Sequence, residues 1–191
     1  NTNIIGTVNV LECIRQTGCV KSFLNVTTDK VYLNDNKNKK FKETDRLCGF
    51  DPYSNSKSCS ELVTYSYNNA FLSNYCAVST VRAGNVLGGG DFSKDRIIPD
   101  AIRAMKTNST LTIRQPYSIR PYQFVLEPLF LYLDIAEKQF MNKEKYAGNY
   151  NVGPNAKACI TTKQLIEKFN TFVDFKYVCL SDNTDIKNIT Y

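Results

Sequence analysis

Tyr53 and Lys57 stand four positions apart in the run Tyr-Ser-Asn-Ser-Lys, and both side chains can take part in proton transfer. On a helix this spacing places them on one face, one turn apart. A tyrosine with its ordinary pKa of about 10 is a poor base at neutral pH, but a nearby ammonium favours the phenolate. Because the chain has 12 tyrosines among 191 residues and is rich in lysine, chance alone would supply about one such pair. The surrounding residues must therefore decide whether this pair does chemistry.

Histidine is absent from the chain, which excludes Ser-His and Cys-His nucleophile systems. Proton transfer must then fall to tyrosine, lysine, aspartate or glutamate. The seven cysteines are odd in number and include no Cys-x-x-Cys pair. We therefore expect reduced, mostly structural thiols and no metal site.

Polar side chains follow two predicted strands at the points where these strands end. Thr28, Asp29 and Lys30 come directly after residues 22–27, and residues 82–85 follow residues 77–81. In open α/β sheets, ligands bind beyond the carboxyl ends of the strands. The sequence therefore places candidate site residues at this edge of a sheet.

The elements that must position these residues alternate between helices and strands. Ile4, Val8 and Leu11 recur at helical spacing and predict a helix that ends near Gly18. A second helix begins near Pro52, and on it Leu62, Tyr65, Asn69 and Leu72 share a face. The predicted helices are residues 3–16, 53–72, 99–106, 128–139 and 161–169, and the predicted strands are residues 22–27, 77–81, 111–114 and 149–152. Alternation of this kind predicts a parallel α/β sheet, while the segment after Phe175 carries no clear pattern.

Composition and charge limit the class of protein. With 42% hydrophobic residues, the chain can bury the core of one domain or of two small lobes. The net charge is +6, but the densest basic run, in residues 37–42, lacks the aromatic residues of a base-stacking surface and is interpreted as a solvated loop. No stretch approaches the roughly 18 apolar residues that span a bilayer, and the polar start lacks a signal-peptide pattern. We expect a cytoplasmic protein without a nucleic-acid or membrane partner.

Five blocks of sequence occur in an order that resembles a known family. The blocks are Gly6-Thr7-Val8-Asn9-Val10-Leu11-Glu12, Thr27-Thr28-Asp29-Lys30, Asp51-Pro52-Tyr53-Ser54-Asn55-Ser56-Lys57, residues 82–91 (Arg-Ala-Gly-Asn-Val-Leu-Gly-Gly-Gly-Asp) and Arg120-Pro121-Tyr122-Gln123. Together they resemble the extended short-chain dehydrogenase/reductase family. Within it, Thr28-Asp29-Lys30, Gly88-Gly89-Gly90-Asp91 and the run after Arg120 are similar to the CDP-glucose 4,6-dehydratases, whereas the related dTDP-glucose enzymes carry Thr-Asp-Glu at the first of these places.

The resemblance implies an NAD-dependent reaction on a nucleotide sugar that leaves a 4-keto-6-deoxy sugar without net oxidation. Tyr53 would take the proton of the sugar 4-hydroxyl, and Thr28 would hydrogen-bond the same hydroxyl. Lys30 as base and Asp29 as acid would then remove water across C5 and C6, which requires a neutral amine and a protonated carboxyl. Lys57 would supply the positive charge that favours the tyrosine phenolate and would hydrogen-bond the nicotinamide ribose.

The same resemblance implies which residues bind the cofactor and the substrate. Cofactor contacts are assigned to Thr27, Tyr53 and Lys57, and substrate contacts to Asn85, Arg96 and Arg120, the last as a bidentate partner of the diphosphate. Each residue also has a structural reading: a surface lysine, an exposed Asp-Lys ion pair, a loop arginine. The run Gly88-Gly89-Gly90 is either a flexible turn or a phosphate cradle, and a cradle needs a helix directly after it.

A Gly-x-x-Gly-x-x-Gly turn between a strand and a helix, the family's anchor for the NAD pyrophosphate, does not occur in the chain. The resemblance therefore implies an internal piece of a longer enzyme, a partial Rossmann-type parallel sheet with a small substrate-binding α/β lobe. Residues 1–84 would be the C-terminal part of the NAD-binding domain, and residues 85–191 a mixed segment whose elements at about 120–152 return to that domain. In the family, helices that match residues 3–16 and 53–72 commonly pair across a dimer interface, so the resemblance implies a homodimer. Other nucleotide-sugar epimerases or reductases of the family, and a non-catalytic remnant, remain alternatives.

Overall fold

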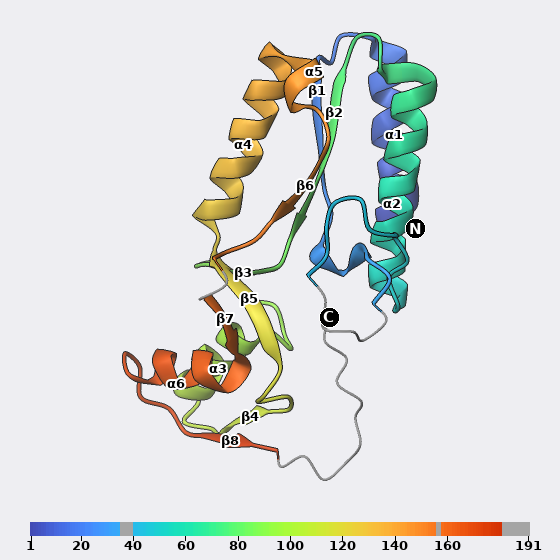
Figure 1. The fold of residues 1–191 in the computed structure, drawn as a ribbon. Helices are drawn as coiled ribbons and strands as arrows, with labels where there is room; N and C mark the ends of the chain where they lie inside the picture. Colours follow the sequence, from blue (N-terminus) through green and yellow to red (C-terminus); the bar gives the residue numbers. More distant parts are fainter. Residues whose placement is uncertain (35–39, 156–157, 181–191) are drawn as a thin grey trace. The chain divides into compact units, whose positions relative to one another are not determined.

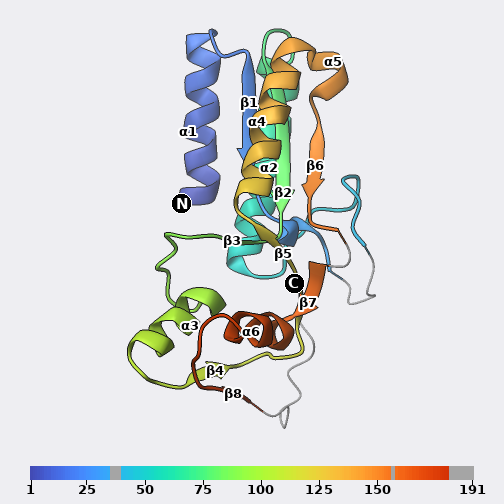
Figure 2. The same cartoon turned by 90° about the vertical axis from the view of Figure 1, so that its left-hand side faces the viewer.

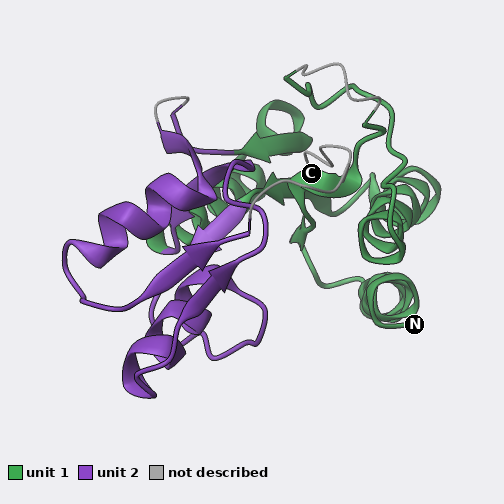
Figure 3. Ribbon diagram, turned by 90° about the horizontal axis from the view of Figure 1, so that it is seen from below, with its two compact units in different colours: residues 1–84, 126–152, 191 green, residues 85–125, 153–190 purple. Residues whose placement is uncertain are grey.

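The structure is a computed structural model that describes residues 1–34, 40–155 and 158–180. Part of the basic run at 37–42 lies outside the described residues. The chain divides into two compact units, one of residues 1–84 and 126–152 and the other, within the described part, of residues 85–125, 153–155 and 158–180 (Figure 3). The chain therefore leaves the first unit after Gly84, builds most of the second, and returns at Leu126.

The first unit is built on a three-stranded parallel sheet in the order β1-β2-β6 (Figure 1). Its strands are β1 (Ser22–Val26), β2 (Ala77–Ala83) and β6 (Asn149–Val152). Ser22 lies opposite Ala77 in the first pair, and Thr80 lies opposite Asn149 in the second. Every residue of β2 is buried, as expected for the central strand of a sheet covered on both faces.

Helices cover both faces of this sheet (Figures 1 and 2). On one face lie α1 (Thr2–Thr17) and α2 (Pro52–Tyr67), the latter continued by the π-helical turn η2 (Asn68–Leu72). On the other lie α4 (Leu126–Met141) and the short α5 (Lys143–Tyr146). Helix α1 ends at Gly18, which adopts a left-handed φ of 62° and donates its backbone N–H to the carbonyl of Ile14, the role predicted for this glycine. A small apolar core forms between α1, η2 and β2, and its members are Leu11, Ile14, Leu72, Cys76 and Val78.

The buried face of α2 is polar, which differs from the face expected from hydrophobic spacing. All of the residues that the helix buries carry polar side chains: Ser54, Ser58, Ser60, Glu61 and Thr64. Leu62 and Tyr65, predicted to share a face with Leu72, are 52% and 67% exposed, and only Leu72 is buried. The reason is that α2 meets α1 and β1 through hydrogen bonds between small side chains, and these take the interior positions.

The second unit contains two small sheets and two helices. Strand β5 (Ile119–Phe124) pairs in parallel with β3 (Asn85–Leu87) and antiparallel with β7 (Cys159–Thr161), while β4 (Leu111–Ile113) pairs in parallel with β8 (Tyr177–Cys179). The helices are α3 (Ile97–Lys106) and α6 (Thr162–Asn170), and the second begins with a capping box between Thr161 and Gln164. The core of this unit consists of Ala101, Ala104, Leu111, Ile113, Ile166 and Phe175.

Each helix and strand predicted from the sequence is present, with boundaries shifted by a few residues. The strands β3, β5, β7 and β8, the short helix α5 and a 3-10 turn after β1 (η1, Asp29–Val31) were not predicted. An α/β fold with a parallel sheet is confirmed.

Candidate active site

The carboxyl end of β1 carries three predicted catalytic residues on one tight turn. Thr28 caps the 3-10 turn η1, so that Thr28, Asp29 and Lys30 follow one another directly beyond the strand. The Thr28 hydroxyl donates to Asp29 Oδ1 at 3.1 Å, and the Val31 backbone N–H donates to the Thr28 carbonyl at 3.4 Å. The hydroxyl and carboxyl proposed to act on substrate are therefore already in contact with each other.

The start of α2 is fixed by Asp51, whose carboxylate accepts hydrogen bonds from the backbone of Tyr53 at 2.9 Å and of Ser54 at 3.0 Å. Pro52 in the first turn has the backbone angle that a helix start requires. Burial raises the pKa of Asp51, but hydrogen bonds from Ser54 and Tyr53, together with the charge of Lys30, outweigh burial and leave the pKa lowered. Lys30 thus acts electrostatically on the helix start that carries Tyr53.

Lys57 joins α2 to the end of β1. Its ammonium donates to the carbonyl of Val26 at 3.2 Å, one residue before Thr27. Desolvation by partial burial lowers the pKa of Lys57. Tyr53, one turn earlier, is 51% exposed. Within this unit the structure therefore brings Thr28, Asp29, Lys30, Tyr53 and Lys57 to one end of the sheet.

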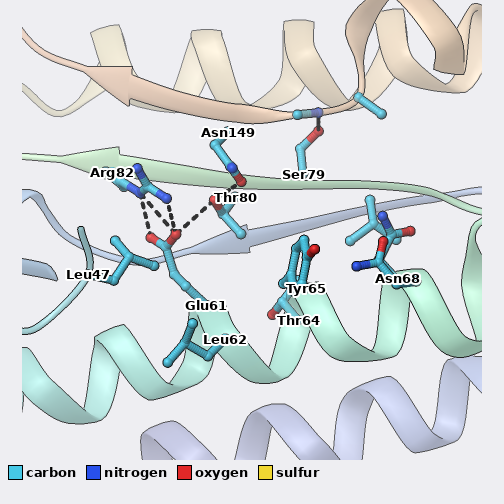
Figure 4. Close-up of a pocket in the computed structure, with 14 residues that line it drawn as sticks. Leu47, Glu61, Leu62, Thr64, Tyr65, Asn68, Ser79, Thr80, Arg82 and Asn149 are labelled. Carbon is cyan, nitrogen blue, oxygen red and sulfur yellow. Dashed lines mark hydrogen bonds and ion pairs between the residues drawn. The ribbon is translucent and has the colours of Figure 1, made fainter. Parts of the chain in front are cut away.

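A buried ion pair that the sequence reasoning missed lies beside these residues. Glu61 and Arg82 have side chains that are each 2% exposed, and the Arg82 Nε donates to both carboxylate oxygens of Glu61, at 2.8 and 2.9 Å. Thr27 also donates to Glu61, at 2.5 Å. Thr80 donates to the same carboxylate at 3.2 Å (Figure 4). Burial lowers the pKa of Arg82, but hydrogen bonding and the charge of Glu61 outweigh it and raise the pKa overall. The feature of the sequence that could have identified this pair was the position of Glu61, four residues after Lys57 on the same predicted helix.

The ion pair borders a cavity of about 380 Å³ between α2 and the strands β2 and β6 (Figure 4). Its lining includes Leu62, Tyr65 and Asn68 on the helix side and Ser79 and Asn149 on the strand side. The lining mixes apolar and neutral polar groups, with the one buried ion pair at its edge.

The three predicted substrate residues lie in the second unit. Asn85 begins β3, opposite Tyr122 of β5, and Arg120 lies on β5 opposite Ile160 of β7. Arg96 is the residue before α3, is 63% exposed in its side chain, and forms an ion pair with Asp91 at 3.3 Å. Asn85 and Arg120 therefore lie on neighbouring strands of one sheet.

The run Gly88-Gly89-Gly90 does not lead directly into a helix, because α3 begins only at Ile97. A Cβ on Gly88 would lie 2.6 Å from a methyl carbon of Val125, so this glycine allows close packing of two strands' ends. Gly90 has a φ of 80°, typical of a turn. The geometry thus favours the turn over the phosphate cradle.

Over the parts of the chain that the structure describes, no group of three or more His, Cys, Asp or Glu side chains could hold a metal ion. Among the same residues, no helix has the length and apolar character needed to cross a membrane.

Comparison with known proteins identifies relatives over most of the chain. A family model described as GDP-mannose 4,6 dehydratase matches residues 1–163. The CDP-glucose 4,6-dehydratase of Salmonella typhimurium is 42% identical over 177 residues, which cover 90% of this chain and 49% of that protein. The chain thus spans about half the length of this curated relative.

Solved structures confirm the Rossmann-type fold class. The dTDP-glucose 4,6-dehydratase of Bacillus anthracis, determined in complex with NAD, has a TM-score of 0.75 and 24% identity, covering 94% of this chain and 56% of that one. A UDP-N-acetylglucosamine 4-epimerase of Methanobrevibacter ruminantium has a TM-score of 0.77 and 20% identity, covering 95% and 57%. At these identities the likeness concerns the fold.

Proposed function

Because the chain belongs to the extended short-chain dehydrogenase/reductase family, in the group that the GDP-mannose 4,6 dehydratase model describes, we propose that it carries the catalytic residues of an NAD-dependent nucleotide-sugar 4,6-dehydratase. The proposed substrate is CDP-glucose and the product CDP-4-keto-6-deoxyglucose, the substrate class of the 42% identical relative. The observation that carries the proposal is the hydrogen bond from Lys57 to Val26, which ties the Tyr53 helix to the strand leading into Thr28, Asp29 and Lys30.

The residues at this end of the sheet fit a nicotinamide cofactor. Lys57 has three N–H donors, and the Val26 carbonyl takes one of them, so donors remain for ribose hydroxyls. We assign Thr27, Tyr53 and Lys57 to the cofactor side of the site. When bound, NAD would supply the hydride acceptor for C4 of the sugar and the hydride donor for C6.

Tyr53 takes the proton of the sugar 4-hydroxyl in the first step. Lys57 lies one helical turn further along α2, on the same face as Tyr53. Thr28 hydrogen-bonds the same substrate hydroxyl and so fixes the direction of proton transfer. These three residues come from two elements that the Lys57 hydrogen bond holds together.

Lys30 and Asp29 carry out the loss of water. As a neutral amine, Lys30 takes the C5 proton, which the neighbouring 4-keto group makes acidic. A protonated Asp29 gives its proton to the leaving 6-hydroxyl, so the C5–H and C6–O bonds break and a C5–C6 double bond forms. Both residues lie on the turn η1 and are consecutive in the chain, so the proposed acid and base come from one turn.

The second unit supplies substrate contacts in this proposal. Arg120 binds the diphosphate through its planar guanidinium, Asn85 offers an amide, and Arg96 is a further cationic contact. In these terms residues 1–84 belong to the NAD-binding domain, and the segment from residue 85 supplies the substrate-binding lobe, with elements at about 120–152 returning to the first.

A homodimer and a cytoplasmic location complete the proposal. Large apolar side chains remain exposed on α1, α2 and the following turn, and they are Ile5, Val10, Leu62, Tyr65 and Phe71, at 50–67% exposure. Burial of such side chains in a helix-to-helix contact between two copies would stabilise the dimer. The cysteines, all free thiols, are compatible with a reducing compartment.

The test uses the complete protein encoded by the gene that carries this chain, incubated with NAD and CDP-glucose. We expect the alkaline ultraviolet absorbance of a 4-keto sugar. A signal with dTDP-glucose but none with CDP-glucose would overturn the nucleotide assignment. A 4-epimer of the substrate, or net consumption of a reduced cofactor, would assign the protein to the epimerases or reductases instead, and no reaction with any sugar nucleotide would reject the enzyme proposal.

Substitution of Lys30 tests the assignment of the base. Lys30→Ala should still oxidise C4 but stop before loss of water, so that reduced cofactor accumulates at 340 nm in amounts stoichiometric with enzyme. Lys106→Ala, an exposed lysine at the end of α3, is the matched control and should turn over like the wild type. Normal water loss by Lys30→Ala would show that another group is the base.

A further inference from the structure

The proposed reaction assigns no role to the buried ion pair of Glu61 and Arg82. A buried ion pair is a weak source of net stability, since removing two charges from water costs about as much as their attraction returns. Of the groups that bond to this pair, one lies just before the turn η1 and another lies just after it.

The first of these contacts fastens the entry to the turn. Thr27 donates its hydroxyl to Glu61 Oε1 at 2.5 Å, and its backbone N–H donates to the Val81 carbonyl at 2.8 Å. A hydrogen bond to a buried carboxylate is stronger than one between neutral groups. Thr27 is buried, so water does not compete for this bond. The backbone that continues into Thr28 is thereby fixed against both α2 and β2.

The second contact fastens the exit from the turn. Tyr32 directly follows η1, and its hydroxyl accepts from Arg82 Nη1 at 2.6 Å while donating to Asn151 Oδ1 at 2.5 Å. Burial raises the pKa of Tyr32, which keeps the phenol protonated and able to donate. Arg82 also donates to the Glu43 carbonyl at 3.0 Å. Each partner of the ion pair therefore holds one end of the same three-residue turn.

We propose that Glu61 and Arg82 are positioning residues that fix the turn carrying Asp29 and Lys30 relative to Tyr53 and Lys57. Glu61 lies one helical turn beyond Lys57, so α2 contacts the strand end twice, through Lys57 at Val26 and through Glu61 at Thr27. The hydride step uses α2 together with Thr28, and the loss of water uses Asp29 and Lys30 on η1. The ion pair sets the distance between the two sets of groups, an inference that rests on the proposed function.

The test compares two hydroxyl donors to the same carboxylate. Thr27→Val removes the donor at the entry to η1, whereas Thr80→Val removes one in the middle of β2, and both side chains are buried. We expect Thr27→Val to lower kcat about tenfold to a hundredfold with KM for the sugar nucleotide unchanged, the loss of one hydrogen bond to a charged group. Thr80→Val should stay within about twofold of wild type. Thr27→Ser keeps the hydroxyl and should restore most of the turnover.

A second readout does not depend on activity. Hydrogen exchange of the Lys30 and Val31 amides, which bond back to Thr28, should accelerate in Thr27→Val and not in Thr80→Val. Equal effects of the two variants on kcat and on exchange would overturn the positioning role. So would a raised KM for NAD with unchanged kcat in Thr27→Val, which would make Thr27 a cofactor contact only. A wild type without turnover would reject the proposed function, and the exchange measurement alone would then decide the positioning role.

Discussion

Glu61→Leu should be among the most destabilising single substitutions in the first unit, because it leaves the Arg82 guanidinium buried without a counter-charge. The Arg82 side chain is 2% exposed, and it makes three hydrogen bonds to Glu61, through Nε to each carboxylate oxygen and through Nη2 to one of them. Removing one partner of a buried pair costs about 3–5 kcal/mol of unfolding free energy. Arg82→Met should lower the free energy of unfolding by a similar amount, since it leaves the Glu61 carboxylate buried without a counter-charge and also removes the contact to Tyr32.

The double variant Glu61→Leu/Arg82→Met tests whether the two residues stabilise the fold as an ion pair or independently of each other. Because no buried charge remains, its cost should fall short of the sum of the single costs by about 2–3 kcal/mol, at the upper end of measured couplings. The assay is urea unfolding at neutral pH, with free energies extrapolated to water. Additive costs, or single costs below about 1 kcal/mol, would refute the description of a dry, paired Glu61 and Arg82.

Salt provides a matched control for this prediction. Glu12 and Arg15 form an ion pair on α1 whose side chains are 32% and 42% exposed. The destabilisation caused by Glu12→Gln should be far smaller than that of Glu61→Leu and should shrink further in high salt. The effect of Glu61→Leu should persist in high salt, since ions do not reach the buried pair. A strong salt dependence at Glu61 would mean that water enters the site.

Three further substitutions probe the start of α2. Asp51→Ala should lower the unfolding free energy by about 1 kcal/mol by removing the helix cap, and Asp51→Asn, which keeps the cap, is the control. Because the pKa of Asp51 is lowered in the folded state, its contribution is present above the ordinary value of 3.8 and is lost as the pH falls through the lowered pKa. An advantage of the wild type over Asp51→Ala that persists in acid would contradict this reasoning. Gly49→Ala places a Cβ 2.3 Å from the backbone of Ser54 and should lower the free energy of unfolding in urea by about 1–3 kcal/mol or more. Gly148→Ala, with no atom within 4 Å of the new Cβ, is the control. Equal losses of stability in the two variants would argue against the close approach at Gly49. The stability of the wild type relative to Lys57→Met should rise as the pH increases from the lowered folded pKa of this lysine toward 10.5. The reason is that the penalty for burying the charged amine disappears as the amine loses its proton. A stability difference between the two proteins that does not change with pH would show that the amine is solvated.

The elements of the first unit were predictable because their signals are local. Helical spacing of Ile4, Val8 and Leu11, with Gly18 at the end, is sufficient to define α1. Buried strands such as β2 are short apolar runs between breaks. The candidate catalytic residues followed from the rule that sites form beyond strand ends, joined to a resemblance that no single motif could carry. The turn η1 then placed three of them side by side.

The strands of the second unit depend on partners far away in sequence. Strand β5 contains a proline and no alternation of apolar and polar residues, and its two neighbours lie more than thirty positions away on either side, at β3 and β7. Strand β8 has three residues and pairs with β4. Such strands exist because the sheet completes their hydrogen bonds, which local propensity does not record.

The polar interior of α2 was the other feature beyond the reach of hydrophobic patterning. A search for apolar spacing selects Leu62 and Tyr65, which are exposed, and passes over serines and threonines that are buried. Small hydroxyl side chains let helices approach closely, and they satisfy their hydrogen bonds across the contact. Thr7 meets Ser60 at 2.8 Å between α1 and α2.

This polar contact determines how α2 is rotated about its own axis, and the rotation determines the site. Asn25 on β1 donates to Ser60 at 3.0 Å and to Thr64 at 2.8 Å, two hydroxyls one turn apart on α2. A shift of α2 by one residue would rotate it by about 100° and break both bonds. The same shift would move Lys57 and Glu61 away from the end of β1. Apolar packing tolerates small rotations better than directional hydrogen bonds do. The hydroxyl-lined face of α2 therefore allows Lys57 and Glu61, four residues apart, to contact Val26 at the end of β1 and the next residue, Thr27.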